Sequence, residues 1–180
     1  ATQNISGSCE ILFSAKQNNI ATLSLDLLQM EIDSIVQHNQ LLTYSYNDTL
    51  IIINLSAVLN TGDLDSLTVH YKGSPQGDPS NWGGFYFQGN YAYNLGVGFA
   101  ADPHNYGRVW HPSFDNFVER ATYSFVLKTP NGLKGYANGL LTSSINNGTH
   151  NINTWNLNQE IPTYLACIAS APYTHVNQTY

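Results

Sequence analysis

The sequence has few charged residues, and they form no basic cluster. Only 10% of its 180 residues are charged, against about 25% in an average globular protein. Six Lys or Arg and twelve Asp or Glu give a formal net charge of -6. Proteins that bind nucleic acid or an anionic membrane surface carry clustered Lys and Arg. The composition therefore predicts neither of these partners.

Long hydrophobic runs and cysteines are also scarce. The longest apolar run is centred on Leu50–Ile53 and falls far short of the roughly 20 residues that span a membrane, so no membrane span is predicted. Cys9 and Cys167 are far apart and either pair across the fold or remain two buried thiols. The chain begins with Ala1 rather than Met, so we expect that a leader or a longer upstream sequence was removed.

Motifs of common catalytic sites are missing as well. The sequence contains no H-E-x-x-H zinc motif and no G-x-S-x-G nucleophile turn. Its Gly-rich tract at residues 77–84 is not followed by Lys-Ser and a helix, so it does not predict a phosphate site. Asp102 with His104, and His111 with Asp115, have spacings that a metal ion can use, but isolated His residues in loops more often form polar surface.

Two carboxylate pairs have the spacing for acid–base chemistry of the glycosidase kind: Asp63 with Asp65, and Asp102 with Asp115. The competing interpretation is that these aspartates accept hydrogen bonds from backbone N–H groups in tight turns, and we favour it. No catalytic or metal-ligating residue is therefore predicted within this chain.

Aromatic residues and strand patterns are abundant in this sequence. Twelve Tyr, seven Phe and three Trp supply large side chains for a core that needs no disulfide support in a chain of this length. Residues 21–27 alternate with leucines on one face, and residues 65–71 and 149–157 alternate in the same way, as expected for strands. Residues 27–37 have an apolar spacing of four, but their β-branched side chains favour a strand over a helix.

Turn residues divide these strands into hairpins. Asn47-Asp48 joins residues 41–46 to 49–55, and Gln88-Gly89-Asn90 joins residues 85–87 to 91–93. Residues 162–176 predict one long bent strand or two short ones. The sequence as a whole predicts one all-β domain over residues 1–180, a sandwich or a curved open sheet.

Several aromatic residues lie in or beside loops: Trp82, Phe85, Tyr86, Tyr91, Tyr93 and Trp110. Aromatic rings on the loops of a β-sandwich can stack on sugars. The alternative interpretation, which we favour, is that they fill one end of the sheet.

Five segments resemble, in order and spacing, the amino-terminal domain of M1-family zinc aminopeptidases of the leukotriene A4 hydrolase and aminopeptidase N type. They are G-G-F-Y at 83–86, W-H-P-S-F-D-N at 110–116, R-A-T-Y at 120–123, the 133–140 segment that ends in A-N-G-L, and residues 161–171, which resemble the P-x-S/T-Y-L strand that closes the domain in the family. The resemblance covers most of the chain. His111 and Ser113 depart from the Phe and Cys that are usual in the family.

The resemblance implies a saddle-shaped all-β domain that packs against a catalytic domain of the thermolysin type. That downstream domain carries the zinc in the family, so we expect no cofactor in this chain. A peptide substrate then binds at the interface between the two domains.

The resemblance also implies a substrate-facing loop. In the family, a T-Q-x-E segment of the β-domain contacts the free amine of the substrate, and the matching positions here are Asn94, Leu95, Gly96 and Val97. Leu95 and Val97 replace its polar residues, and their side chains accept no hydrogen bond from an ammonium group. The parent protein then either recognises termini differently or has lost its peptidase activity.

Two functions remain from the sequence. The first is the non-catalytic amino-terminal domain of an M1-like metallopeptidase, which shapes access of the substrate. The alternative is a free-standing β-sandwich that binds carbohydrate or protein. Low charge and abundant Asn, Thr and Tyr point to an extracytoplasmic setting. The sequence also has five N-x-S/T sites, most of which chance explains in a chain this rich in Asn, Ser and Thr. These sites are Asn4, Asn47, Asn54, Asn147 and Asn177.

Overall fold

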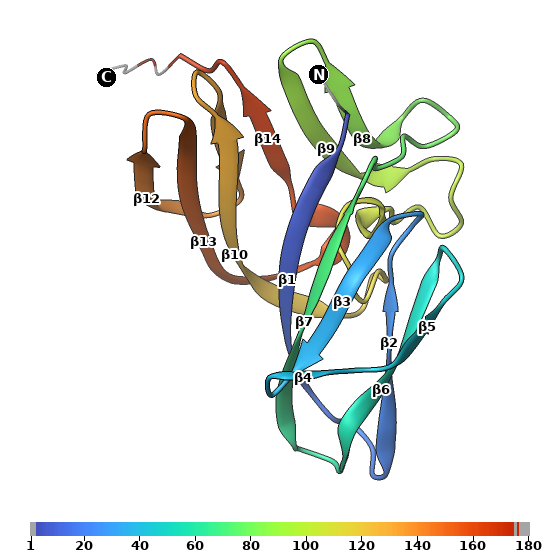
Figure 1. Cartoon of the computed structure of the whole chain (residues 1–180). Helices are drawn as coiled ribbons and strands as arrows, with labels where there is room; N and C mark the ends of the chain where they lie inside the picture. Colours follow the sequence, from blue (N-terminus) through green and yellow to red (C-terminus); the bar gives the residue numbers. More distant parts are fainter. Residues whose placement is uncertain (1–2, 175, 177–180) are drawn as a thin grey trace.

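The computed structural model describes residues 3–174 and 176, and antiparallel strands dominate this part of the chain (Figure 1). This confirms the all-β prediction. Two short 3₁₀ turns are the helical elements of the described residues, η1 (Gly107–Val109) and η2 (Thr163–Leu165). Among the same residues, no helix has the length and apolar character needed to cross a membrane. His175 and the site at Asn177 lie outside the described residues.

The first sheet descends into the lower half of the molecule in Figure 1 and has the order β1-β7-β3-β4. Its strands are β1 (Ile5–Ser14), β7 (Leu64–Gly73), β3 (Glu31–Gln37) and β4 (Gln40–Leu41). Strand β1, which the sequence analysis did not identify, pairs with β7 over its whole length. Strand β3 occupies most of residues 27–37, so the preference for a strand there is confirmed.

The second sheet has the order β2-β6-β5. Its strands are β2 (Ile20–Asp26), β6 (Leu50–Leu59) and β5 (Tyr44–Tyr46). Strands β5 and β6 form the predicted hairpin, in which the Asn47 side chain accepts the N–H groups of Thr49 and Leu50 at the turn.

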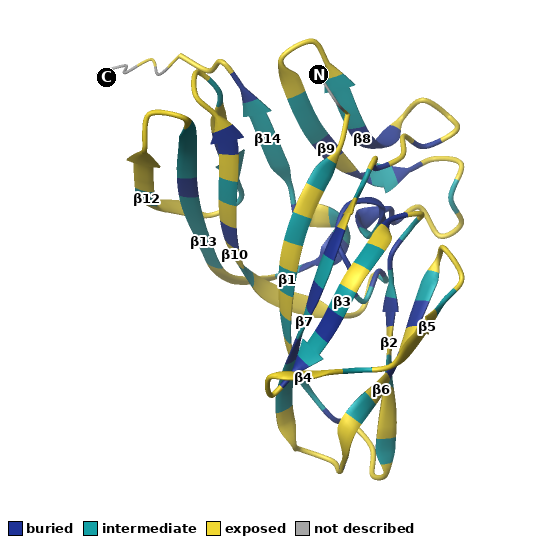
Figure 2. Ribbon diagram, viewed as in Figure 1, coloured by how far each residue is buried: buried dark blue, intermediate teal, exposed yellow. Residues whose placement is uncertain are grey.

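A first core takes side chains from both of these sheets. All its fully buried members but one are aliphatic or Met: Leu25, Leu27, Met30, Ile35, Ile51, Ile53, Leu67, Val69 and Tyr71. Alternate residues of each strand point inward, so burial switches from one residue to the next along β7 (Figure 2).

The upper half contains two further sheets, of order β11-β14-β9-β8 and β10-β13-β12. The strands of the first are β8 (Gly83–Gln88), β9 (Tyr91–Gly98), β11 (Lys134–Ala137) and β14 (Ile168–Ala171). Those of the second are β10 (Arg120–Pro130), β12 (Leu140–Asn146) and β13 (His150–Pro162). Strands β8 and β9 form the second predicted hairpin.

A second core lies in this half and is rich in aromatic rings: Phe85, Tyr106, Val109, Trp110, Phe125 and Ala166. The segment after β13 differs from its prediction. Residues 163–165 turn into η2 and only the short strand β14 follows, because Pro162 ends the ladder of β13 and the chain must turn to reach β9.

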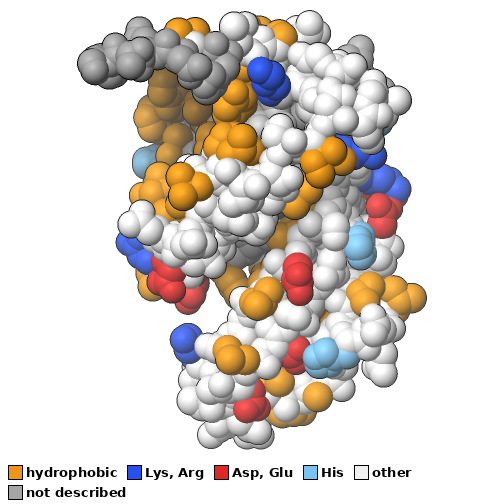
Figure 3. All heavy atoms as spheres, turned by 90° about the vertical axis from the view of Figure 1, so that its left-hand side faces the viewer, with side chains coloured by type: hydrophobic (Ala, Val, Ile, Leu, Met, Phe, Trp, Pro, Cys, Tyr) orange, Lys and Arg blue, Asp and Glu red, His pale blue; other side chains and the backbone are white. Residues whose placement is uncertain are grey.

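Few charged side chains appear on the face seen in Figure 3, where hydrophobic side chains are scattered among polar ones. This face includes the left edge of Figure 1, where β12 forms the free edge of its sheet and carries exposed Leu140, Leu141 and Ile145.

Candidate functional site

The predicted substrate-facing residues lie near the end of β9, and Asn94 faces inward. Its residue exposure is 1%. The side-chain amide donates to the Ala166 carbonyl at 3.0 Å, and the side-chain oxygen accepts the Ile168 N–H at 2.7 Å. Because both ends of this side chain are bonded to backbone, Asn94 fastens β9 to the chain after η2.

Leu95 and Val97 point away from Asn94, as strand alternation requires. Leu95 is 36% exposed and Val97 is half-buried. Gly96 between them is buried, and a Cβ atom there would collide with the Tyr164 carbonyl. Only glycine allows β9 and η2 to approach this closely.

Three exposed apolar side chains lie on the segments near this contact, and one of them, Leu95, points away from η2. Leu95 is flanked by Asn94 and Gly96, which touch Ala166 and Tyr164, and Leu165 stands between those two residues on the neighbouring segment. The Phe117 ring packs edge-on against Tyr164, with centroids 5.2 Å apart. Leu165 and Phe117 are 45% and 46% exposed. We call Leu95, Phe117 and Leu165 the apolar docking surface.

The turn after η1 is held by Asp115, whose side chain is fully buried. Its carboxylate accepts the backbone N–H groups of Gly107 and Arg108, and the Arg108 guanidinium at 3.3 Å. The Asp115 N–H in turn donates to the Asp26 carboxylate at 3.0 Å. This network links the end of β2 to the upper half of the molecule, so Asp115 is structural.

His111 is buried beside this turn. Its ring lies edge-on to Trp110 at 4.3 Å, and its Nδ1 atom is 3.1 Å from the Pro112 carbonyl. Burial lowers the pKa of His111, although the Pro112 carbonyl and Asp115 oppose this. The Nε2 atom of His111, the Nε1 atom of Trp110 and the Oγ atom of Ser113 are buried with no partner among the described residues.

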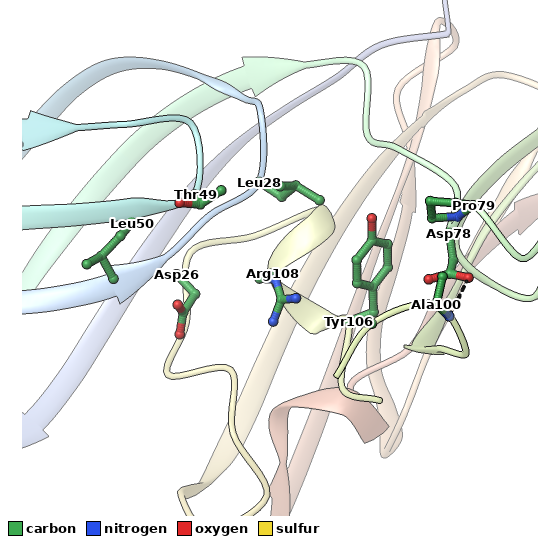
Figure 4. Close-up of a pocket in the computed structure, with 10 residues that line it drawn as sticks. Asp26, Leu28, Thr49, Leu50, Asp78, Pro79, Ala100, Tyr106 and Arg108 are labelled. Carbon is green, nitrogen blue, oxygen red and sulfur yellow. Dashed lines mark hydrogen bonds between the residues drawn. The ribbon is translucent and has the colours of Figure 1, made fainter. Parts of the chain in front are cut away.

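A pocket of about 530 Å³ separates the turns of the second sheet from the loops of the upper half (Figure 4). Its walls are mostly apolar, and three charged side chains lie among them. The lining residues are Asp26, Leu28, Thr49, Leu50, Asp78, Pro79, Ala100, Ala101, Tyr106 and Arg108.

The charged groups of the pocket differ in their electrostatics. Burial raises the pKa of Asp26, a rise that the Asp115 N–H opposes. Burial also acts to raise the pKa of Asp78, but hydrogen bonds from Ser80, Ala100 and Ala101 outweigh it and hold that pKa below its usual value. Arg108 lies over the Tyr106 ring, 5.5 Å from its centroid.

The described residues contain no group of three His, Cys, Asp or Glu that could hold a metal ion. The His104 ring bonds the Ala101 carbonyl. Asp63 accepts the Asn60 N–H in a turn, and Asp65 accepts the Ser66 N–H and contacts His38. Asp63 makes a contact of the kind that the turn interpretation predicted, whereas Asp65 lies in strand β7 and contacts His38 from another part of the chain.

Cys9 and Cys167 are free thiols, so the disulfide alternative is wrong for this structure. Each lies near a backbone carbonyl, that of Pro112 for Cys9 and that of Asn94 for Cys167. Burial raises the pKa of Cys9 to about 12 and also raises the pKa of Cys167. Neither thiol is activated as a nucleophile.

The loop aromatics divide into two groups. Phe85 and Trp110 are buried in the second core, and Tyr86 stacks on Tyr93, as the sheet-filling interpretation predicted. Trp82 and Tyr91 are 55% and 51% exposed, which the sheet-filling interpretation did not predict. The Trp82 ring stacks on exposed Phe99, with centroids 6.0 Å apart.

Comparison with known proteins identifies the family. The model of the Peptidase M1 N-terminal domain matches residues 1–165. The chain belongs to this family. An M1 amino-terminal domain is all-β here as the resemblance implied, and the buried turn at Asp115 is the W-H-P-S-F-D-N segment that carried part of that resemblance. No curated protein matches the sequence.

Solved structures share the fold of this M1 amino-terminal domain. An M1 zinc metallopeptidase from Deinococcus radiodurans is 22% identical with a TM-score of 0.82, covering 93% of this chain and 38% of that one. A two-domain M1 zinc metallopeptidase bound to L-arginine is 22% identical with a TM-score of 0.83, and the match covers 94% of this chain and 38% of that one. Leukotriene A4 hydrolase from Saccharomyces cerevisiae is 16% identical with a TM-score of 0.68, and the match covers 93% of this chain and 26% of that one. The chain thus spans well under half of these proteins.

The sequence analysis missed the pocket of this M1 amino-terminal domain. Asp26, Asp78 and Arg108 come from segments far apart in sequence, and no spacing rule connects them. A local signal existed only for Asp78, because Asp-Pro-Ser is typical of a turn in which the carboxylate accepts backbone N–H groups.

Proposed function

We propose that this chain is the non-catalytic amino-terminal domain of an M1-like zinc metallopeptidase. It packs on the downstream catalytic domain and shapes access of a peptide substrate to the active-site cleft. The observation that carries the proposal is the family match over residues 1–165.

The chemistry of the candidate site supports a scaffold without catalysis. The polar side chains near β9 and the η1 turn, those of Asn94 and Asp115, are bonded to this chain's own backbone. No metal-binding group occurs among the described residues. The proposal assigns zinc to the downstream catalytic domain, because the solved structures that share this fold are zinc metallopeptidases.

The apolar docking surface supports the packing role. Leu95, Phe117 and Leu165 are each more than a third exposed, and burying such side chains against another domain contributes about 25 cal/mol per Å² of apolar area.

The first experiment compares the 180-residue chain with the complete product of its gene. The sequence downstream of Tyr180 should encode H-E-x-x-H with a Glu some twenty residues later. With zinc, the complete product should hydrolyse aminoacyl-anilides or longer peptides, and the 180-residue chain should hydrolyse none. A stop codon after Tyr180, or turnover by the chain alone, would contradict the proposal.

A second experiment locates the packing surface. Leu95→Asp in the complete product should weaken domain packing and lower kcat/KM by about tenfold or more, because a charge is then buried at the interface. Leu140→Asp is the matched control, since Leu140 is 77% exposed on β12, away from the docking surface. Equal effects of the two variants would refute the assignment.

One observation favours a second candidate, a module that binds carbohydrate. The exposed Trp82 ring, stacked on Phe99, offers a flat apolar face of the kind that sugars stack on. A glycan array should then show binding that Trp82→Ala abolishes. If the wild-type chain binds no glycan on the array, the carbohydrate-binding function is refuted.

We further propose an extracytoplasmic location, on the low charge content and the many Asn, Ser and Thr residues. Fractionation of the native cells with an antibody against this chain tests it, and a cytoplasmic signal contradicts it.

A further inference from the structure

One carboxylate in the pocket is buried and only half satisfied. Asp78 has a residue exposure of 3%. Its Oδ1 atom accepts the Ser80 N–H at 2.9 Å, the Ala100 N–H at 3.1 Å and the Ser80 hydroxyl. Its Oδ2 atom has no hydrogen-bond partner, and no Lys, Arg or His of the described chain pairs with it. A buried charged oxygen is costly unless a positive group or a donor meets it.

The local backbone holds this oxygen in place. A Cβ atom on Gly98 would lie 2.6 Å from Oδ2 and 3.1 Å from the Cγ atom of Tyr106. The oxygen therefore occupies space that a side chain at position 98 would fill, beside the Tyr106 ring. Figure 4 shows the Asp78 carboxylate, Pro79, Ala100 and Tyr106 on one side of the pocket, with Asp26 and Leu50 on the other.

The pocket as a whole has an excess of negative charge. Arg108 is the basic residue among its lining groups, and the fully buried Asp115 already pairs with it at 3.3 Å. Asp26 and Asp78 remain without a basic partner. The Tyr106 ring attracts cations through its faces, and the Arg108 guanidinium already lies over it, 5.5 Å from its centroid. Leu28, Leu50 and the alanines supply an apolar wall for a hydrocarbon stem.

This combination selects one class of ligand. A metal ion would find too few ligating side chains, whereas an ammonium or guanidinium group on an alkyl stem can use a carboxylate and apolar walls together. The volume of about 530 Å³ lies within the range of roughly 300–1,000 Å³ typical of small-ligand pockets.

We propose that this pocket binds an organic cation, the ammonium or guanidinium group of a basic amino-acid side chain, with Asp78 as its counter-ion. The inference goes beyond the packing role and uses a different part of the chain. Two sources share this chemistry: a free basic amino-acid derivative, and a Lys or Arg side chain of a polypeptide.

Titration of the 180-residue chain by nuclear magnetic resonance tests the proposal. The probes are L-argininamide, the peptide amide Gly-Arg-Gly, and L-citrullinamide, whose side chain is neutral and nearly the same shape. The two arginine probes should shift the amide signals of Ala100, Ala101 and Tyr106 saturably, and the citrulline probe should not. The tighter of the two arginine probes identifies the source.

Asp78→Asn is the diagnostic variant, because an Asn side-chain oxygen still accepts the bonds from Ser80 and Ala100. It should keep the spectrum of the fold and weaken the arginine probes by about tenfold or more, since the counter-ion is lost. Glu119→Gln removes the same charge from an exposed position outside the pocket and should leave binding unchanged.

Four outcomes overturn the proposal. They are no saturable shift with either arginine probe, equal shifts with the citrulline probe, equal weakening by Asp78→Asn and Glu119→Gln, and saturable binding of calcium ions at the same amides. Failure of the packing experiment on Leu95 leaves these results unaffected, so the two proposals can be judged separately.

Discussion

The two cores of this domain differ in what they bury. The first, between the lower sheets, buries mainly aliphatic side chains, with Tyr71 as its buried titratable group and Cys9 partly buried against it. The second buries aromatic rings next to His111, Asp115 and Asn105. Four polar atoms there, at Asn105, Trp110, His111 and Ser113, have no partner among the described residues. The first core can be understood from burial alone, whereas the second depends on a polar network, and the docking surface and pocket adjoin it.

The largest expected effect is the loss of Asp115, which holds the polar network of the second core. Replacing Asp115 with Ala should destabilise the fold by about 3–5 kcal/mol, because it leaves the partly buried Arg108 and two backbone N–H groups without their partner. Urea denaturation of the chain measures this. Glu160→Ala, at an exposed position of β13, is the control and should change stability by no more than about 0.5 kcal/mol. A loss below about 1 kcal/mol for Asp115→Ala would show that the network is not essential.

The first core should respond to volume instead. Leu25 has no exposed surface, so Leu25→Ala should cost about 2–4 kcal/mol through lost burial and the cavity that remains. Leu25→Met keeps the volume and should cost less than about 1.5 kcal/mol. Denaturation of both variants tests the claim, which fails if the Met variant is as unstable as the Ala variant.

The smallest expected effect is on the pH dependence of stability, through His111 in the second core. Burial keeps the pKa of His111 below the usual His value, so the unfolded chain takes up a proton that the folded chain resists. The stabilisation is complete above about pH 6.5 and is lost as the pH falls below that value. Thermal unfolding between pH 8 and 5 should show this decline, and His111→Phe should flatten it. An identical decline in both proteins would remove His111 as the cause.

Local patterns in the sequence were enough to predict the hairpins and the all-β class. Asn47-Asp48 and Gln88-Gly89-Asn90 join strands that are adjacent in sequence, and period-two alternation marks both partners. Strand β1 was not predicted because it pairs with β7, fifty or more residues away, and no turn directly joins the two strands. Its own alternation, with Cys9, Ile11 and Phe13 on one face, was present but weak.

The site was predicted less completely for the same reason. The family resemblance predicted residues 94–97 as a substrate-facing loop, but only the structure shows that Asn94 faces inward while Leu95 faces outward. The pocket depends on Asp78, Gly98 and Tyr106 meeting across loops, and a sequence does not show which loops meet. Whether residues 1–180 form one domain remains a prediction.

The backbone contact between Gly96 and Tyr164 has a consequence for how this family can diversify. The close backbone contact at Gly96 and the two hydrogen bonds of the Asn94 side chain fix the separation of β9 from the segment around η2. The Leu95 and Val97 side chains take no part in these contacts, so polar or charged residues at both positions should leave the strand in place.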